Sequence, residues 1–144
     1  MSVRVDFAFG APNRLRTACD VVRKHYLAGR QLVIYQSDPR ELQRFDRMLW
    51  GFEPTAYIPH VMIDDPLANQ TPILLCEHAE VLAHHNAPDT WLINLDKKGP
   101  PLPSSFHRIL EIVSTQESDR QLARQRWRQY QEQGYQVNAH HLGE

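Results

Sequence analysis

The sequence predicts an α/β fold: a single three-layer domain with a largely parallel sheet and helices on both faces. Three observations support this prediction. Strand-like and helix-like segments alternate through the first half of the chain, which is the pattern of parallel strands joined by right-handed helical crossovers. One strand-like segment is a short, continuous apolar run, as in strands that are buried on both faces. The length of 144 residues suits one ordinary domain, so we expect residues 1–144 to form a single unit.

The chain opens with a strand and a helix. Residues 3–9 alternate apolar and polar side chains, which is typical of a strand with one buried face. Asn13 then stands where an N-cap is expected, and residues 14–28 carry apolar side chains at helical spacing. Gly29 follows this segment, as glycine commonly follows the last turn of a helix.

A second strand and a second helix come next. Residues 31–36 form the continuous apolar run. Ser37, Asp38 and Pro39 are typical of a helix start, because aspartate caps free backbone amides and proline fits the first turn. We expect this helix to extend to about Trp50.

The second half of the chain has a less regular pattern. Residues 51–72 contain several prolines and predict no regular element, whereas residues 78–86 fit either a turn or a short helix. Three further strands are expected, then a long helix that ends at Gly134 and a last short strand. These segments are residues 72–77, 91–95, 108–113, 118–133 and 135–137.

Composition limits the class of protein. The net charge is −1, with 16 basic and 17 acidic residues, so no overall field attracts the chain to nucleic acid or to an anionic membrane. Any recognition of an anion must therefore be local. Cys19 and Cys76 lie far apart and predict reduced, buried thiols of a cytosolic protein. We see no signal peptide and no apolar run of about 18 residues, so we expect a soluble cytoplasmic protein.

No motif indicates a cofactor, a metal or a catalytic centre. Walker and GxGxxG sequences are absent, and six glycines in the whole chain give little scope for a phosphate cradle. The adjacent pairs His84-His85 and His140-His141 point apart on any regular element and lack the spacing of a zinc site. Cys76, within an apolar segment, is expected in the core. We therefore predict no catalytic residue, no cofactor and no metal.

The long helix carries an arginine row formed by Arg120, Arg124 and Arg128, with Trp127 at its edge. At about 100° per residue, side chains four positions apart fall on one stripe of a helix. Two interpretations remain open from these residues alone. The commoner one is a solvated face beside a core tryptophan, and the other is a site for an anionic ligand that also carries an apolar group.

A second group of large apolar residues lies where the second helix pattern breaks. It extends over residues 48–52 and 57–62 and includes Trp50, Tyr57 and Ile58. Aromatic residues in loops either cover the core or anchor a partner. The pattern favours neither interpretation over the other.

Taken together, these residues resemble a known family, the chi subunit of bacterial DNA polymerase III holoenzyme. The resemblance extends over most of the chain and depends on the order and spacing of several segments. They are AGRQLVIY (28–35), DRMLW (46–50), YIPH (57–60), RQLARQRWRQY (120–130) and GYQVN (134–138). The last two are the most specific.

The resemblance implies a non-catalytic accessory subunit without a cofactor, located in the bacterial cytoplasm at the nucleoid-associated replisome. In this family, chi binds the acidic C-terminal tail of single-stranded DNA-binding protein, which ends in proline and phenylalanine. It also pairs with the psi subunit, which links it to the clamp loader. The implied fold is similar to nucleotide-binding folds but has no nucleotide site.

Specific residues follow from the resemblance. Arg124 would hold the terminal carboxylate of the tail by a charge-assisted contact. Arg120 and Arg128 would meet its aspartates, and Trp127, Val113 and Trp50 would wall the pocket for the phenylalanine. The family has lysine at some of these basic positions and tyrosine where Trp127 stands, so the donor geometry differs here although the charge is kept.

Two further expectations concern the same resemblance. Tyr57, Ile58 and Pro59 would form the surface for psi. Arg126 projects toward the inner side of the long helix, so its guanidinium must either reach solvent past apolar neighbours or pair with a carboxylate. The sequence alone indicates no partner for it.

Two other functions are weighed against this one. The first is a small doubly wound enzyme whose arginine row clamps a phosphorylated or nucleotide ligand. The second is direct binding of single-stranded nucleic acid by the arginines and aromatic rings of the long helix. The absence of a nucleophile or base at a recognisable spacing disfavours the first, and the net charge and short basic stripe disfavour the second.

Overall fold

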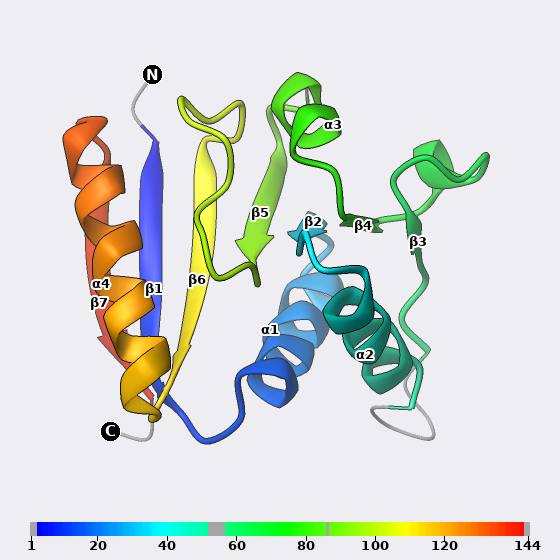
Figure 1. Cartoon of the computed structure of the whole chain (residues 1–144). Coiled ribbons are helices and arrows are strands. Elements are labelled where there is room, and N and C mark those ends of the chain that lie inside the picture. Colours follow the sequence, from blue (N-terminus) through cyan, green and yellow to red (C-terminus); the bar gives the residue numbers. More distant parts are fainter. Residues whose placement is uncertain (1–2, 52–56, 86, 143–144) are drawn as a thin grey trace.

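Seven strands form one sheet in the computed structural model, which describes residues 3–51, 57–85 and 87–142. Their order is β3-β4-β2-β5-β6-β1-β7, and every pairing between these strands is parallel (Figure 1). The predicted parallel α/β sheet is therefore confirmed. The strands are β1 (Arg4–Ala11), β2 (Gln31–Tyr35), β3 (His60–Met62), β4 (Ile73–Cys76), β5 (Thr90–Asn94), β6 (Arg108–Ser114) and β7 (Gln136–His141).

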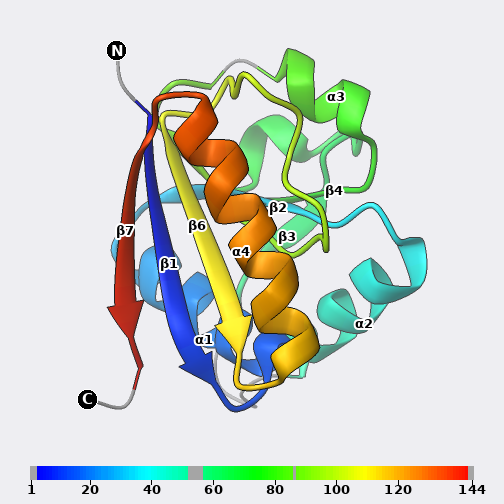
Figure 2. The same ribbon diagram turned by 60° about the vertical axis from the view of Figure 1, so that its left-hand side comes forward.

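Helices cover both faces of this sheet and give three layers, with α4 and α1 on opposite sides of β6 (Figure 2). Along β2, Leu32 and Ile34 pack toward α1 and α2, whereas Val33 and Tyr35 pack toward α3 and α4. This alternation explains the continuous apolar run, because both faces of the strand are buried. The helices are α1 (Arg14–Leu27), α2 (Pro39–Trp50), α3 (Ala79–His84) and α4 (Glu117–Glu132), with a short 3-10 turn η1 (Ala68–Gln70).

The predicted helix signals act as expected. The Asn13 side chain accepts a hydrogen bond from the Arg16 amide at 3.1 Å, and the Asp38 carboxylate accepts one from the Arg40 amide at 2.9 Å. Pro39 occupies the first turn of α2. Gly134 follows α4 with a φ of +77°, a left-handed conformation that favours glycine over residues with a side chain.

The structure corrects the prediction for residues 51–72. This segment contains β3 and η1, which the sequence pattern does not show. β3 has three residues and pairs only with β4 at the edge of the sheet, so it is too short to give a periodic signal. The last strand is also longer than expected, because β7 continues to His141 with mostly exposed polar side chains.

Both cysteines are buried and free, as predicted. Burial raises the pKa of the Cys19 thiol to about 12, and burial also raises the pKa of the Cys76 thiol. Neither thiol is therefore a reactive thiolate at neutral pH. Within the described ranges, every helix is too short or too polar to span a membrane.

Candidate functional site

A groove lies beside α4, between that helix and the outer strands β1 and β7. Its volume is 460 Å³, and its lining is mainly apolar, with two guanidinium groups at the rim. We call it the α4 groove, and it is lined by Phe9, Ala123, Arg124, Trp127, Arg128 and Ala139. The structure therefore brings Arg124, Trp127 and Arg128 together, as the helical spacing predicts.

Trp127 is fixed in this groove by other aromatic rings. Its ring centroid lies 5.0 Å from that of Phe7 and 6.3 Å from that of Phe9, both of which extend from β1. The indole is only partly buried, so one side of it remains available to a ligand. Such tilted aromatic contacts hold the ring at little entropic cost on binding.

The arginine row is exposed and partly neutralised within the helix. Glu117 forms ion pairs with Arg124 at 3.3 Å and with Arg120 at 3.5 Å. The side chains of Arg124 and Arg120 are 55% and 50% exposed, and exposed pairs of this kind contribute about 0–1 kcal/mol. A carboxylate from a ligand can therefore replace Glu117 at small cost. Arg120 itself does not line the groove.

Val113 and Trp50 do not join these residues. Val113 is fully buried and lies in the same core cluster as Trp127, beneath the groove and not on its wall. Trp50 ends α2 on the opposite side of the sheet, where its ring contacts His60 of β3. Five strand spacings separate β3 from β1, a distance of about 24 Å. The expectation that Trp50 walls the same pocket as Trp127 is therefore wrong.

Trp50 instead belongs to a second surface, which we call the aromatic corner and define by Trp50, Tyr57 and His60. The Trp50 ring centroid lies 4.0 Å from that of His60 and 5.4 Å from that of Tyr57. Trp50 is 46% exposed and Tyr57 is 69% exposed, whereas Ile58 is only 2% exposed. Ile58 is thus a core residue and cannot contact a partner directly, which corrects its assignment to the psi surface.

His60 fixes the aromatic corner to the sheet. Its Nδ1 lies 2.8 Å from the Ile58 carbonyl oxygen, and its Nε2 lies 2.9 Å from a carboxylate oxygen of Asp46 on α2. The imidazole is fully buried, so it provides a rigid base under the exposed Trp50 ring. Pro59 lies between Ile58 and His60 and is partly exposed.

Arg126 has a carboxylate partner, Glu111 of β6. Both side chains are almost completely buried, and Arg126 Nε donates to Glu111 Oε1 at 3.1 Å. The other oxygen of Glu111 accepts hydrogen bonds from Tyr130 at 2.7 Å and from Asn94 at 2.9 Å. Burial and the charge of Glu111 raise the pKa of Tyr130 well above its usual value, so this phenol keeps the proton that it donates.

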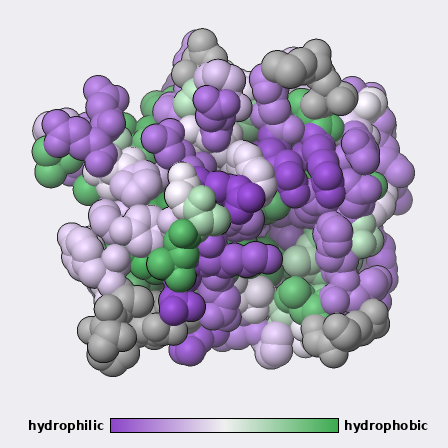
Figure 3. All heavy atoms as spheres, turned by 180° about the vertical axis from the view of Figure 1, so that it is seen from behind, coloured by the Kyte–Doolittle hydropathy of each residue, from purple (hydrophilic) through white to green (hydrophobic). Residues whose placement is uncertain are grey.

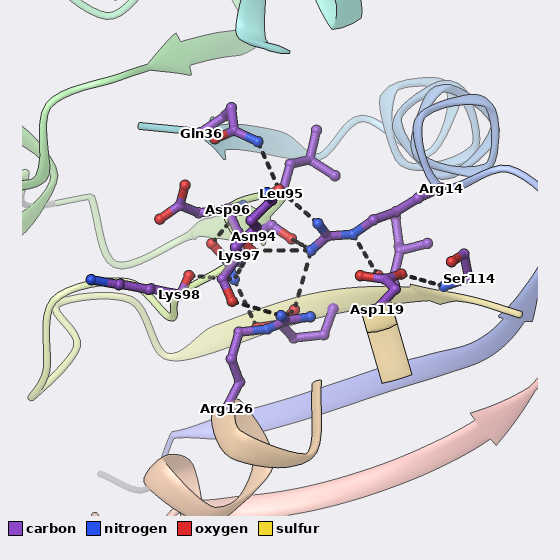
Figure 4. A network of polar contacts seen from close by, with 12 residues as sticks. Arg14, Gln36, Asn94, Leu95, Asp96, Lys97, Lys98, Ser114, Asp119 and Arg126 are labelled. Carbon is purple, nitrogen blue, oxygen red and sulfur yellow. Dashed lines mark hydrogen bonds and ion pairs between the residues drawn. The ribbon is translucent and has the colours of Figure 1, made fainter. Parts of the chain in front are cut away.

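The carboxyl ends of β2, β5 and β6 open into a larger crevice of 850 Å³. Parallel α/β folds commonly bind ligands at such a place. In this chain, the Arg14 guanidinium is held there by the protein itself. Its Nε donates to the Ile112 carbonyl and its Nη1 to the Leu95 carbonyl, both at 2.8 Å (Figure 4).

Backbone amides around this crevice are also bound by the protein's own carboxylates. The Ser114 amide donates to Asp119 at 2.7 Å, and the Ser37 amide donates to Asp96 at 3.2 Å. A phosphate would have to displace these carboxylates and would meet their negative charge. The crevice therefore disfavours a nucleotide, in agreement with the lack of a glycine-rich loop. Among the described side chains, no three His, Cys, Asp or Glu residues gather as metal ligands.

Comparisons with known proteins show the family of the chain. The family model described as "DNA polymerase III chi subunit, HolC" matches residues 1–138. The chain belongs to the DNA polymerase III chi subunit family. It is thus an accessory subunit of the replisome and part of the DNA polymerase III complex, in line with the expectation that it has no catalytic activity of its own.

Curated relatives carry the same name, DNA polymerase III subunit chi. The relative from Pseudomonas aeruginosa is 32% identical over 129 residues, which cover 90% of this chain and 87% of the relative. The relative from Haemophilus influenzae is 24% identical over 88% of this chain and 85% of its own length. The relative from Escherichia coli is 22% identical over 83% of this chain and 80% of its own length.

Sequence reasoning missed three residues of this chi chain's α4 groove: Phe9, Ala123 and Ala139. Phe9 lies on the same face of β1 as Phe7, so the alternation in residues 3–9 indicates its side of the sheet. Phe9 is only partly covered by α4 because of the way in which the helix crosses the strands. No local sequence pattern shows this crossing. Ala139 lies in the part of β7 that was not predicted.

Proposed function

We propose that the chain binds the acidic C-terminal tail of single-stranded DNA-binding protein in the α4 groove and links it to the clamp loader through the psi subunit. The observation that supports this proposal is the combination within one groove of an aromatic wall and two rim arginines. A peptide that ends in phenylalanine presents an apolar ring and a carboxylate at the same residue. The groove offers a partner for each.

The apolar part of the proposed contact is the space over the apolar lining of the α4 groove, which Trp127, Phe9, Ala123 and Ala139 form. Burial of a phenylalanine ring there would contribute about 1.5–3 kcal/mol. Two small alanine side chains leave room for a large ring, and the fixed Trp127 indole can stack on it. We therefore assign the terminal phenylalanine of the tail to this space.

The charged part of the contact is assigned to the arginine row. Arg124 and Arg128 stand at the rim, close enough to the apolar floor to meet a carboxylate that belongs to the same residue as the ring. Arg120 lies one helical turn before Arg124, on the side away from Arg128, and would meet an aspartate that precedes the phenylalanine in the tail. We expect micromolar-class binding that salt weakens strongly, because the charged contacts are exposed.

The test is a fluorescence titration with a labelled acidic peptide that ends in proline and phenylalanine. We expect Arg124→Ala and Trp127→Ala each to weaken binding about 10-fold or more. A peptide whose terminal carboxylate is amidated should lose a similar factor. The matched control is Arg40→Ala, which removes an exposed arginine from α2 and should leave binding unchanged. Undiminished binding by Arg124→Ala and Trp127→Ala would reject this site, and no binding by the wild type would reject the function.

Glu117 provides a test of opposite sign. Because its carboxylate pairs with Arg120 and Arg124 in the free chain, Glu117→Gln should release both guanidinium groups for the ligand. The exposed pairs contribute about 0–1 kcal/mol, so the affinity for the peptide should rise about two- to fivefold. A loss of affinity in this variant would show that Glu117 contacts the ligand or orders the helix instead.

We propose the aromatic corner as the surface for the psi subunit. The exposed rings of Trp50 and Tyr57 and the partly exposed Pro59 form an apolar anchor beside the edge strand β3. Its position at the opposite edge of the sheet from the α4 groove would let both partners bind at once. Co-purification of psi with wild type, Trp50→Ala and Arg124→Ala separates the two surfaces. Psi binding should be lost only in Trp50→Ala, and the reverse pattern would reject this assignment.

A further inference from the structure

A basic row crosses the side of the sheet that faces away from α4. On this side, α1 packs against β2 and β6, whereas among the described residues α1 and α2 make no extensive contact with β1 or β7. The register pairs Arg4 with Gln136 of β7 and with Arg108 of β6. Leu92 pairs with Ile109, so the preceding residue Trp91 lies opposite Arg108. Figure 3 shows this side of the molecule, where strongly hydrophilic residues gather over the upper half.

Trp91 holds two arginines of the row in place. The guanidinium carbon of Arg108 lies 4.2 Å from the indole centroid, and that of Arg30 lies 4.6 Å from it. His25 packs edge-on against the same indole, with centroids 5.0 Å apart, and lies 3.0 Å from Arg30 Nη1. Stacking of this kind fixes planar guanidinium groups while leaving other N–H donors directed outward. We use the term basic row for Arg4, Arg108 and Arg30 with Trp91.

The basic row has three guanidinium groups against one carboxylate, that of Asp6, whereas the net charge of the whole chain is −1. The Asp6 carboxylate lies within the row. Arg4, Arg108 and His140 each contact one of its oxygens. Burial raises the pKa of Asp6, but the hydrogen bond from His140 and the charges of Arg108 and Arg4 more than offset this and lower it. At the far end of the row, burial lowers the pKa of His25 to about 4, aided by the positive charges of Arg30, Lys24 and Arg108.

We propose that the basic row binds the phosphates of single-stranded nucleic acid. Arg4 on β1, Arg108 on the adjacent β6, and Arg30, which directly precedes β2, offer guanidinium donors to successive anionic groups of a polymer. Guanidinium planes stacked on an indole also provide flat surfaces for unpaired bases. The family of the chain is compatible with such a ligand, since it is named as a subunit of a DNA polymerase.

An acidic protein segment fits the basic row less well. Such segments are normally anchored by apolar side chains, as in the α4 groove, and the anchor is then the main source of affinity. The floor of the row is polar, formed by Asp6, Asn138 and His140, and the one large ring, Trp91, is covered by arginines. The row and the α4 groove lie on opposite faces of β1, so occupation of one leaves the other accessible. This proposal therefore does not depend on the proposed tail binding.

The experiment uses the full chain alone and a fluorescent single-stranded oligothymidine, with binding followed by anisotropy between 50 and 200 mM salt. Three phosphate contacts predict a slope of about −2 for log K against log salt, or about a 20-fold loss over this range. The double variant Arg4→Ser/Arg30→Ser removes two contacts and keeps the partly buried Asp6–Arg108 ion pair, although it removes the exposed Arg4–Asp6 pair, and its slope should fall to about −0.7. Arg4→Lys/Arg30→Lys restores the charge and should regain most of the binding.

Two controls make the result decisive. Arg40→Ser removes one exposed arginine elsewhere and should change neither affinity nor slope. Thermal melts of each variant establish that the chain is folded. The proposal is overturned if the wild type does not bind at 50 mM salt, if Arg40→Ser weakens binding as much as the double variant, or if a polyglutamate of equal charge binds as tightly as the oligonucleotide.

Discussion

Neutralising Glu111 should strongly destabilise the fold, because this carboxylate is the counter-charge of a buried arginine. Arg126 is 1% exposed. Among the described residues, its Nε donates to Glu111 at 3.1 Å and its Nη1 donates to the Lys97 carbonyl oxygen at 2.9 Å. Its Nη2 has no hydrogen-bond partner there. In Glu111→Gln, the Arg126 charge would stay buried without compensation. Loss of one member of a buried pair costs about 3–5 kcal/mol.

The size of the effect can be expressed as a melting temperature. For 144 residues, the entropy of unfolding is about 0.3 kcal/mol/K, so each kcal/mol corresponds to about 3 °C. Glu111→Gln should therefore lower Tm by about 10–15 °C. Arg126→Met should cost less, because Glu111 keeps its hydrogen bonds from Tyr130 and Asn94 and lies 4.0 Å from Arg14.

The assay is a double-mutant cycle followed by thermal and urea unfolding. The double variant Glu111→Gln/Arg126→Met contains no unpaired Arg126 charge, so it should be more stable than Glu111→Gln alone, with a coupling energy of about 1–3 kcal/mol. A loss in Tm below about 3 °C for Glu111→Gln, which is about 1 kcal/mol, would refute the reasoning. A larger loss for Arg126→Met than for Glu111→Gln would refute the assignment of the main cost to the unpaired arginine.

Two further predictions follow from local features. The His25 imidazole should titrate near the lowered pKa of about 4 and remain neutral at pH 6, as NMR of its ring protons can establish; a midpoint near 6.5 would contradict this. Since the folded chain then binds fewer protons than the unfolded chain, its stability should fall as the pH drops from about 6.5 to about 4, and His25→Asn should reduce this dependence. Gly134→Ala should lower the free energy of unfolding by about 1 kcal/mol, because φ at this position is +77°. The control Gly51→Ala, at a position with a φ of −97°, should leave it nearly unchanged in urea unfolding. Equal effects of the two variants would exclude backbone conformation as the cause.

Local patterns predict most of the fold because they report on single elements. The cap residues Asn13 and Asp38, the continuous run in β2 and the glycine after α4 each depend on near neighbours in the sequence. Trp50 shows the limit of this reasoning. Helical spacing places it at the end of α2, but only the strand order shows that α2 and α4 lie on opposite faces and near opposite edges of the sheet.

The sequence contains the information needed to predict that Arg126 pairs with a carboxylate in β6. Glu111 stands in the middle of the apolar segment predicted over residues 108–113, and a carboxylate buried in a strand requires a partner. The inward-facing Arg126 on α4, the helix that follows β6, is such a partner. What the sequence could not show was the pairing itself, because it depends on the position of α4 along β6.

The same buried pair explains why the exposed arginines of α4 form a row at the groove. Arg120, Arg124, Arg126 and Arg128 belong to one helix and one residue type, yet only Arg126 is buried. A rotation of α4 by one residue, about 100°, would separate Arg126 from Glu111 and break their buried ion pair. That cost selects a single rotation of the helix. In that rotation Trp127, the next residue, lies over Phe7 and Phe9, and Arg124 and Arg128 lie beside it at the rim. The geometry of the groove is thus set from beneath, by a pair of residues that does not line it.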